Sequence, residues 1–242
     1  MAGHSQFKNI MYRKGAQDAK RAKIFAKLAR EITVAAKTGL SDPKQNPRLR
    51  NAIINARSEN MPNDKIKKAL LKASSQDSSN NYLEMRYEGF GNKGIAIIIE
   101  TLTDNKNRTA SNIRTIFQKN GGSLGTQGSA SHNFKQLGVI KIDKSEISDD
   151  KIFELSIEAG ANECYSSEYF HEIQCEMSKV YNVKKKLELS IQNFIFAGIE
   201  WKPLNSVEIR KDKFESTTEF LETLEDNDDV QSVYTNLKFV NN

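Results

Sequence analysis

The most constraining feature of the sequence is the order of strand-like and helix-like segments in its second half. Between about Gly138 and Ile209, short runs rich in β-branched and aromatic residues alternate with longer segments whose apolar residues recur every three to four positions. The strand-like segments are 138–143, 162–167, 170–177 and part of 199–209, and the helix-like segments are 148–160 and 180–198. Ser148 stands where the first helix needs an N-terminal cap. The order strand, helix, strand, strand, helix, strand predicts a ferredoxin-like α/β domain.

The segments on either side of this region fit together as a second α/β domain. Strand-like segments precede it at 82–90, 94–102 and 130–135, with a helix-like segment at 107–121. The tail adds a helix at 213–227 and a strand at 230–239. Because the earlier part lacks a closing helix and strand, we expect the tail to return and complete it.

The first region is expected to be helical. Apolar residues recur at helical spacing from Ala16 to Thr38, namely Ile24, Phe25, Leu28, Ile32, Ala35 and Ala36. A second helix is predicted from about Pro47 to Arg57, and Pro62 is placed to begin a third. The polar segment SSQDSSNN, residues 74–81, reads as a linker.

Together these patterns predict an α+β protein with an N-terminal three-helix domain followed by two α/β (ferredoxin-like) domains, one inserted in the other. The expected domains are residues 1–80, residues 81–134 with 209–242, and the insertion 135–208.

Charge is divided unevenly along the chain. Residues 1–75 hold 17 Lys and Arg against 5 Asp and Glu, a net charge of +12, while the other 19 basic and 26 acidic residues give −7. An asymmetry of this size indicates a polyanionic partner for the basic end, and nucleic acid is the expected one. Charge alone does not distinguish DNA from RNA, and no zinc finger, RNP aromatic motif or clear helix-turn-helix spacing appears.

The residues expected to contact phosphate lie in three groups. In the first helix they share the face opposite the apolar residues: Lys20, Lys23, Lys27 and Arg30. A basic arm precedes that helix with Lys8, Arg13 and Lys14. Near the start of the second helix, Arg48 and Arg50 are expected to support the same surface. Arg21 of the first helix is also expected to bind nucleic acid.

No combination of residues points to catalysis, a metal or a cofactor. The histidines His4, His132 and His171 are scattered, and no nucleophile stands in a pattern with a base. Cys164 and Cys175 are too few for a disulfide scaffold, which favours a reducing cytosol. We expect no enzyme activity, no cofactor and no metal, and a metal-dependent nuclease with scattered carboxylates is the least implausible enzyme. Neither a membrane nor a small-molecule substrate is an expected partner, and a monomer is slightly favoured over an oligomer.

Four further motifs have a structural and a functional interpretation. GFGNKG at 89–94 matches G-x-G-x-x-G but precedes a strand, which favours a hairpin over a phosphate-binding loop. TDNKNRT at 103–109 is typical of a loop with a helix cap, with an interaction site as the alternative. The glycine-rich segment 120–132 predicts a turn. The acidic segment 219–229 is either a solvated helix face or a docking face for a basic partner, including the chain's own N-terminal domain.

Seven ordered motifs resemble the YebC/PmpR family of probable transcriptional regulatory proteins. They are MAGHSQFKNI, QDAKRAKIF, NPRLRNAI, NMPNDKI, YEGFGNKG, TDNKNRT and GGSLGTQGS. The resemblance covers essentially the whole chain. The chain departs from the family's usual Ser-Lys-Trp at Ser5, Gln6 and Phe7, and from its frequent His-Arg at Tyr12 and Arg13.

The resemblance implies three domains and a non-enzymatic role in gene expression. Some members look like DNA-binding transcriptional regulators, and others like ribosome-associated factors that help translation through proline-rich stretches. Mitochondrial relatives are translational activators of a cytochrome oxidase subunit. The family's motifs carry over onto His4, Lys8, Arg13, Lys14, Gln17, Asp18, Lys20, Arg21, Lys23, Arg48 and Arg50. Because the motif begins at the first residue, we expect a bacterial cytoplasmic member without a transit peptide.

Two hypotheses therefore remain open. The first is a regulator of gene expression that binds DNA through its basic N-terminal domain. The second is a translation factor that binds ribosomal RNA and uses the same charges.

Overall fold

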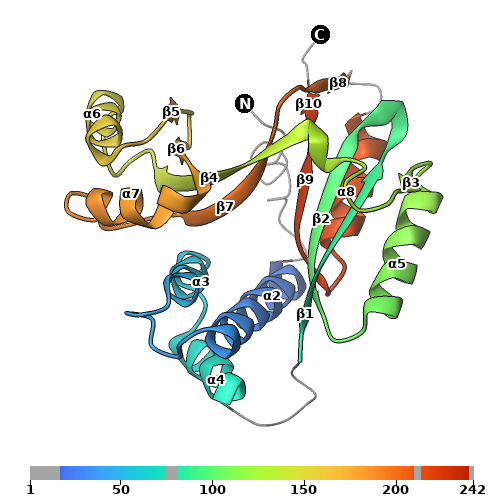
Figure 1. Cartoon of the computed structure of the whole chain (residues 1–242), viewed down its shortest axis with the longest axis horizontal. Coiled ribbons are helices and arrows are strands. Elements are labelled where there is room, and N and C mark those ends of the chain that lie inside the picture. The colour runs from blue at the N-terminus through green and yellow to red at the C-terminus, as the bar shows by residue number, and fades with distance from the viewer. Residues whose placement is uncertain (1–16, 75–80, 210–213, 240–242) are drawn as a thin grey trace. The chain divides into compact units, whose positions relative to one another are not determined.

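The computed structural model describes residues 17–74, 81–209 and 214–239, with side chains in the first helix described from Arg21 onward (Figure 1). Internal contacts divide the chain into two compact units. Of the described residues, the first comprises 17–27, 81–135, 201–209 and 214–239, and the second comprises 28–74 and 136–200. The fold is α+β, with N-terminal helices followed by sheet-containing regions. The residue limits of the three expected domains stay a prediction.

The described part of the N-terminal region contains three helices where the periodicity predicts them: α2 (Gln17–Thr38), α3 (Pro47–Ser58) and α4 (Asn63–Ser74). At the start of α3, the side-chain oxygen of Asn46 accepts a hydrogen bond from the Leu49 amide at 3.0 Å, and Pro47 supplies a φ angle that suits a helix. The Thr33 hydroxyl donates to the Ala69 carbonyl at 3.1 Å and ties α2 to α4. The buried apolar residues include Ile32, Val34, Leu49, Ala56, Ile66 and Ala69.

The predicted apolar face of α2 is wrong at one residue, which was expected to be buried. Ile24 is 39% exposed, although it continues the helical spacing of Leu28 and Ile32. The buried residues of α2 are concentrated between Ile32 and Ala36, where α3 and α4 lie against it, and Phe25 alone is buried before them among the described side chains. Periodicity therefore identified the apolar face of α2, but it did not show how far along the helix α3 and α4 cover that face.

The first sheet has the strand order β3-β1-β2-β9. Its strands are β1 (Leu83–Phe90), β2 (Ala96–Thr103), β3 (Ser123–Leu124) and β9 (Val230–Thr235). β1 and β2 form an antiparallel hairpin, and β9 from the tail pairs antiparallel with β2. The GFGNKG motif makes the hairpin connection, in which Gly94 has a φ of +74°, so the hairpin interpretation is confirmed.

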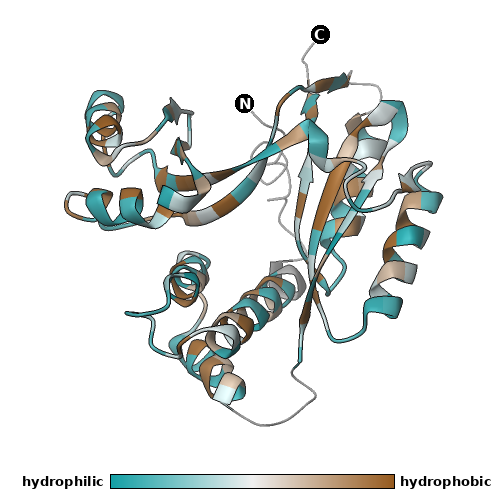
Figure 2. Ribbon diagram, viewed as in Figure 1, coloured by the Kyte–Doolittle hydropathy of each residue, from teal (hydrophilic) through white to brown (hydrophobic). Residues whose placement is uncertain are grey.

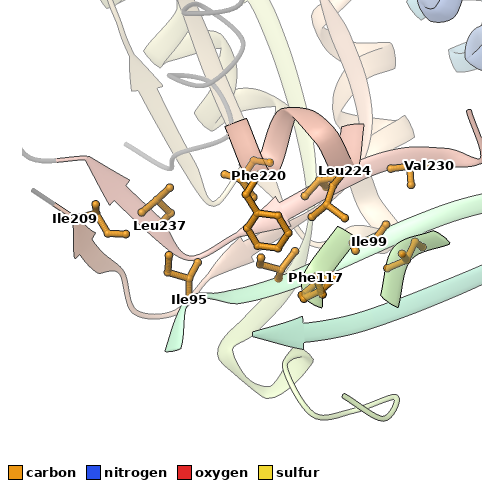
Figure 3. Packing of buried hydrophobic residues seen from close by; sticks show 12 residues of the cluster. Ile95, Ile99, Phe117, Ile209, Phe220, Leu224, Val230 and Leu237 are labelled. Carbon is orange, nitrogen blue, oxygen red and sulfur yellow. The ribbon is translucent and has the colours of Figure 1, made fainter. Parts of the chain in front are cut away.

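One face of this sheet is covered by α5 (Lys106–Lys119) and α8 (Phe214–Glu225). β2 is the most continuously apolar of its strands (Figure 2), because it is buried on both faces. Toward the helices it presents Ile97 and Ile99, which belong to one core cluster with Phe117 and Phe220. Figure 3 shows Ile99 beside the two phenylalanines. The two phenyl rings meet edge to face, with centroids 5.2 Å apart.

The second sheet has the order β5-β6-β4-β7. Its elements follow the chain as β4 (Phe134–Asp143), α6 (Asp149–Ala159), β5 (Glu163–Ser166), β6 (Phe170–Cys175), α7 (Val180–Leu187) and β7 (Phe196–Pro203). This confirms the predicted element order, and the sheet order is that of a ferredoxin-like unit. The core between the sheet and the helices is built from residues such as Ile140, Ile152, Ile173 and Val183.

Several predicted elements differ in detail. The helix expected at 180–198 ends at Leu187. The strand expected at 130–135 begins only at Phe134, as the start of β4, after a short turn at Ser131–Asn133. Ser148 occupies the cap position of α6, but its hydroxyl makes no capping hydrogen bond. A small parallel pair, β8 (Val207–Ile209) with β10 (Leu237–Phe239), was not expected.

Candidate nucleic-acid interface

The predicted phosphate contacts divide by where the structure describes them. Lys8, Arg13 and Lys14 lie outside the described residues, and for Lys20 the description covers the backbone of α2 only. Lys23, Lys27 and Arg30 fall within about 60° of one another around α2, since each residue turns a helix by about 100°. Arg21 lies on a different side, and its guanidinium stands 5.6 Å from the centre of the Phe25 ring. Three of the described cations therefore share one helix face.

Two of these cations contact the C-terminal end of α8. The Lys23 ammonium lies 3.6 Å from a carboxylate oxygen of Asp226 and donates to the Asp226 carbonyl at 3.3 Å. The Lys27 ammonium donates to the carbonyl oxygen of Glu225. The second interpretation of the acidic segment, as a docking face for the chain's own basic residues, is thus the one that these contacts support.

Lys27 is the more enclosed of the two lysines. Burial lowers the pKa of its ammonium, while the negative charges of Glu225, Asp226 and Asp228 act in the opposite direction. Lys23 is still 44% exposed at its side chain. One lysine of the face is therefore largely desolvated beside three carboxylates, and its neighbour remains open to solvent.

Arg48 and Arg50 are engaged within the helical region. Arg48 makes a two-pronged contact with the Glu31 carboxylate, through Nε at 2.7 Å and an Nη nitrogen at 3.1 Å. Arg50 donates to the carbonyls of Pro43 and Lys44, both at 2.9 Å. Their guanidinium groups hold the start of α3 and the turn before it, so the structure gives these two residues a local structural role and does not test a phosphate contact.

The TDNKNRT motif forms a loop and a helix cap, as its structural interpretation predicted. The side-chain oxygen of Asn105 accepts from the Arg108 amide at 3.0 Å and caps α5. The guanidinium of Arg108 donates to Asp104 at 2.7 Å and to the buried carboxylate of Asp229 at 2.9 Å. The Thr109 hydroxyl also donates to Asp229, at 2.7 Å. The motif therefore joins the start of α5 to the segment that follows α8.

The glycine-rich segment at 120–132 is anchored by a buried acid. One carboxylate oxygen of Glu88 accepts from the amides of Ala130 and Ser131, both at 2.8 Å. Burial raises the pKa of Glu88, but the backbone amides of this segment outweigh it, and the net shift of its pKa is downward. Glu88 thus holds the turn as a carboxylate.

The variant Glu88→Gln is expected to lower the free energy of unfolding at neutral pH by about 1–3 kcal/mol, since an ionised acceptor is lost from buried amides. A carboxyl with a depressed folded-state pKa stabilises the protein above its unfolded pKa, and this stabilisation is lost as the pH falls through the folded value. The difference between wild type and variant should therefore shrink on acidification, as denaturant unfolding at a series of pH values would measure. A difference that does not change with pH would contradict this role.

Three of the side chains that the sequence left unassigned, His171, Cys164 and Cys175, are packed in the unit of the second sheet. His171 is buried, and its ring nitrogens lie 2.7 Å from the Ser166 hydroxyl and 2.9 Å from the Ile147 carbonyl. Both cysteines are free thiols, and burial raises the pKa of Cys175 to about 11.

Within the described ranges, no group of three His, Cys, Asp or Glu side chains is placed to hold a metal ion. In the same part of the chain, no helix combines the length and apolar character needed to cross a membrane.

Sequence reasoning missed the specific partners of Lys23 and Lys27. The signal was present in the acidic run from Glu225 to Asp229, which follows a helix with no basic residue in its last turn. A helix end of this kind attracts a cation from elsewhere in the chain. What the sequence did not contain was the identity of that cation, because the two segments lie about 200 positions apart.

Comparison with known proteins places this geometry in a family. Residues 5–76 match the TACO1/YebC N-terminal domain, and residues 82–237 match the TACO1/YebC second and third domain. A probable transcriptional regulatory protein of Pelagibacter ubique is 64% identical over 242 residues, covering 100% of both chains. One of Zymomonas mobilis is 52% identical over 237 residues, covering 98% of this chain and 94% of its own. The crystal structure of a conserved hypothetical protein from Aquifex aeolicus has a TM-score of 0.85 at 37% identity, with 96% of each chain covered. The chain belongs to the TACO1/YebC family.

Proposed function

We propose that this protein is a nucleic-acid-binding regulator of gene expression that binds DNA through its basic N-terminal region. The names of its relatives, probable transcriptional regulatory proteins, support this function. The proposal includes a non-enzymatic role, a location in the bacterial cytoplasm and a monomeric state. It also includes the three-domain limits given above.

The observation that carries the proposal is the cluster of cations on one face of α2. Lys23, Lys27 and Arg30 follow one another along the helix within a region whose net charge is +12. Phosphate groups along a nucleic acid are regularly spaced anions, and a row of cations on a helix can neutralise several of them without reading bases. Lys20 and the arm residues Lys8, Arg13 and Lys14 would extend the same contact.

A salt series separates the two hypotheses that the charge leaves open. Promoter-DNA retention and co-sedimentation with ribosomes are measured side by side on the full chain. The proposal expects DNA to be retained at physiological salt, with an affinity that falls linearly with salt on a double logarithmic plot. Ribosome binding at physiological salt with only weak, sequence-blind DNA binding would contradict the transcriptional function and favour a translation factor that binds ribosomal RNA.

A further inference from the structure

The C-terminal end of α8 needs a cation that its own sequence does not provide. The last carbonyl groups of a helix have no partner inside it and carry partial negative charge. Basic residues commonly fill this place, but the last turn of α8 contains none. Instead, the acids Glu225, Asp226 and Asp228 increase the negative charge there. The end of α8 is therefore a negatively charged site, built from carbonyl and carboxylate oxygens, that attracts cations.

Lys23 and Lys27 supply the missing cation. Lys27 donates to the Glu225 carbonyl, and Lys23 reaches both the carbonyl and the carboxylate of Asp226. These oxygens present to the lysines what a phosphate group would present, namely negatively charged acceptors at hydrogen-bond distance. A lysine ammonium that is held against α8 is removed from the set that can meet a phosphate.

We propose that the acidic end of α8 is an internal competitor for nucleic acid, which occupies Lys23 and Lys27 in the unbound protein and must be displaced on binding. This inference rests on the proposed function, because it concerns regulation of the same cationic face. When one of these lysines contacts nucleic acid, it exchanges the oxygens of α8 for those of a phosphate. The observed affinity is therefore the intrinsic affinity multiplied by the fraction of protein in which the lysines are not held against α8.

The strength of this competition depends on how far the paired side chains are exposed to solvent. Asp226 and Lys23 are about half exposed at their side chains, and pairs of this kind contribute little stability in water. Lys27 donates to the helix end as well, but burial lowers the pKa of its ammonium, so the cost of desolvation offsets much of what this contact contributes. The acidic end of α8 therefore lowers the affinity for nucleic acid without abolishing binding.

The test measures binding of a fluorescently labelled short DNA duplex to the full chain by anisotropy. Asp226→Asn with Asp228→Asn removes two charges at the end of α8. The matched control, Glu163→Gln with Glu168→Gln, makes the same change in net charge at two exposed positions of the other unit. We expect the first pair to bind about two- to fivefold more tightly than wild type, which corresponds to the strength of exposed ion pairs, and the control to match wild type within the error.

Hydrogen exchange gives a second readout that does not depend on a substitution. The amides of Asp226 and Asn227 close the end of α8 on the carbonyls of Glu222 and Leu224. Adding duplex to the wild type should speed exchange of these two amides, because the lysine that holds the adjacent carbonyl departs.

The outcomes separate the inference from the function beneath it. If the wild type does not bind the duplex at all, the proposed function is overturned and the inference with it. If the wild type binds and the Asp226 and Asp228 pair has the affinity of the control, the inference alone is overturned. Should the double variant fail to fold, Asp226→Asn by itself gives the same comparison with Glu163→Gln.

Discussion

A variant that carries Lys23→Glu and Arg30→Glu is expected to bind a short DNA duplex about 10- to 100-fold more weakly than the wild type. Two cations of the α2 face become anions, so two phosphate contacts are lost and replaced by repulsion. The slope of log affinity against log salt should also fall by about two. Anisotropy titrations over a salt series measure both quantities.

The control for this variant changes net charge by the same amount elsewhere. Lys135→Glu with Lys185→Glu reverses two exposed lysines outside α2. If the weakening comes from the α2 face, this control keeps most of the affinity and the salt slope. Equal losses in the two variants would show that binding follows total charge, and that the face itself has no special role.

Truncating Phe117 to alanine is expected to lower the free energy of unfolding by about 3–5 kcal/mol. The Phe117 side chain is fully buried between the first sheet and α8, where it meets Phe220 edge to face. Its removal leaves a cavity in a core formed by segments distant in sequence, which does not collapse easily. Chemical denaturation followed by circular dichroism measures the change.

The same substitution at an exposed phenylalanine provides the comparison. Phe153 on α6 is 55% exposed, so Phe153→Ala should change stability by less than about 0.5 kcal/mol. A loss at Phe117 no larger than that at Phe153 would mean that the first sheet is not held together by this core.

Local patterns predicted the elements well where spacing and packing agree. The N-terminal helices and the ferredoxin-like order could be read from periodicity because each element buries one regular face. The segment after α7 shows the limit of this reasoning. Leu187, Ile191 and Phe194 continue a helical spacing and are all buried, yet the helix ends at Leu187. The Ile195 amide donates to the Lys141 carbonyl at 2.8 Å, so the chain has already turned alongside β4.

The site was less predictable than the fold. Counting charges was enough to indicate a polyanionic partner and to place three cations on one helix face. It was not enough to show that Arg48 would bind Glu31, or that Lys27 would meet the end of α8. Both depend on tertiary proximity, which charge spacing along one segment does not contain.

The pairing of β2 with β9 has a consequence for biosynthesis. Ala96 and Asn236, which are joined by a hydrogen bond of 2.9 Å, are separated by 140 positions. A chain made from its N-terminus therefore exposes the edge of β2 while the whole second sheet is being synthesised. The second sheet has all its strands between Phe134 and Pro203 and can form during that interval. The apolar strand at the centre of the first sheet is thus a segment that needs protection from aggregation in the growing chain.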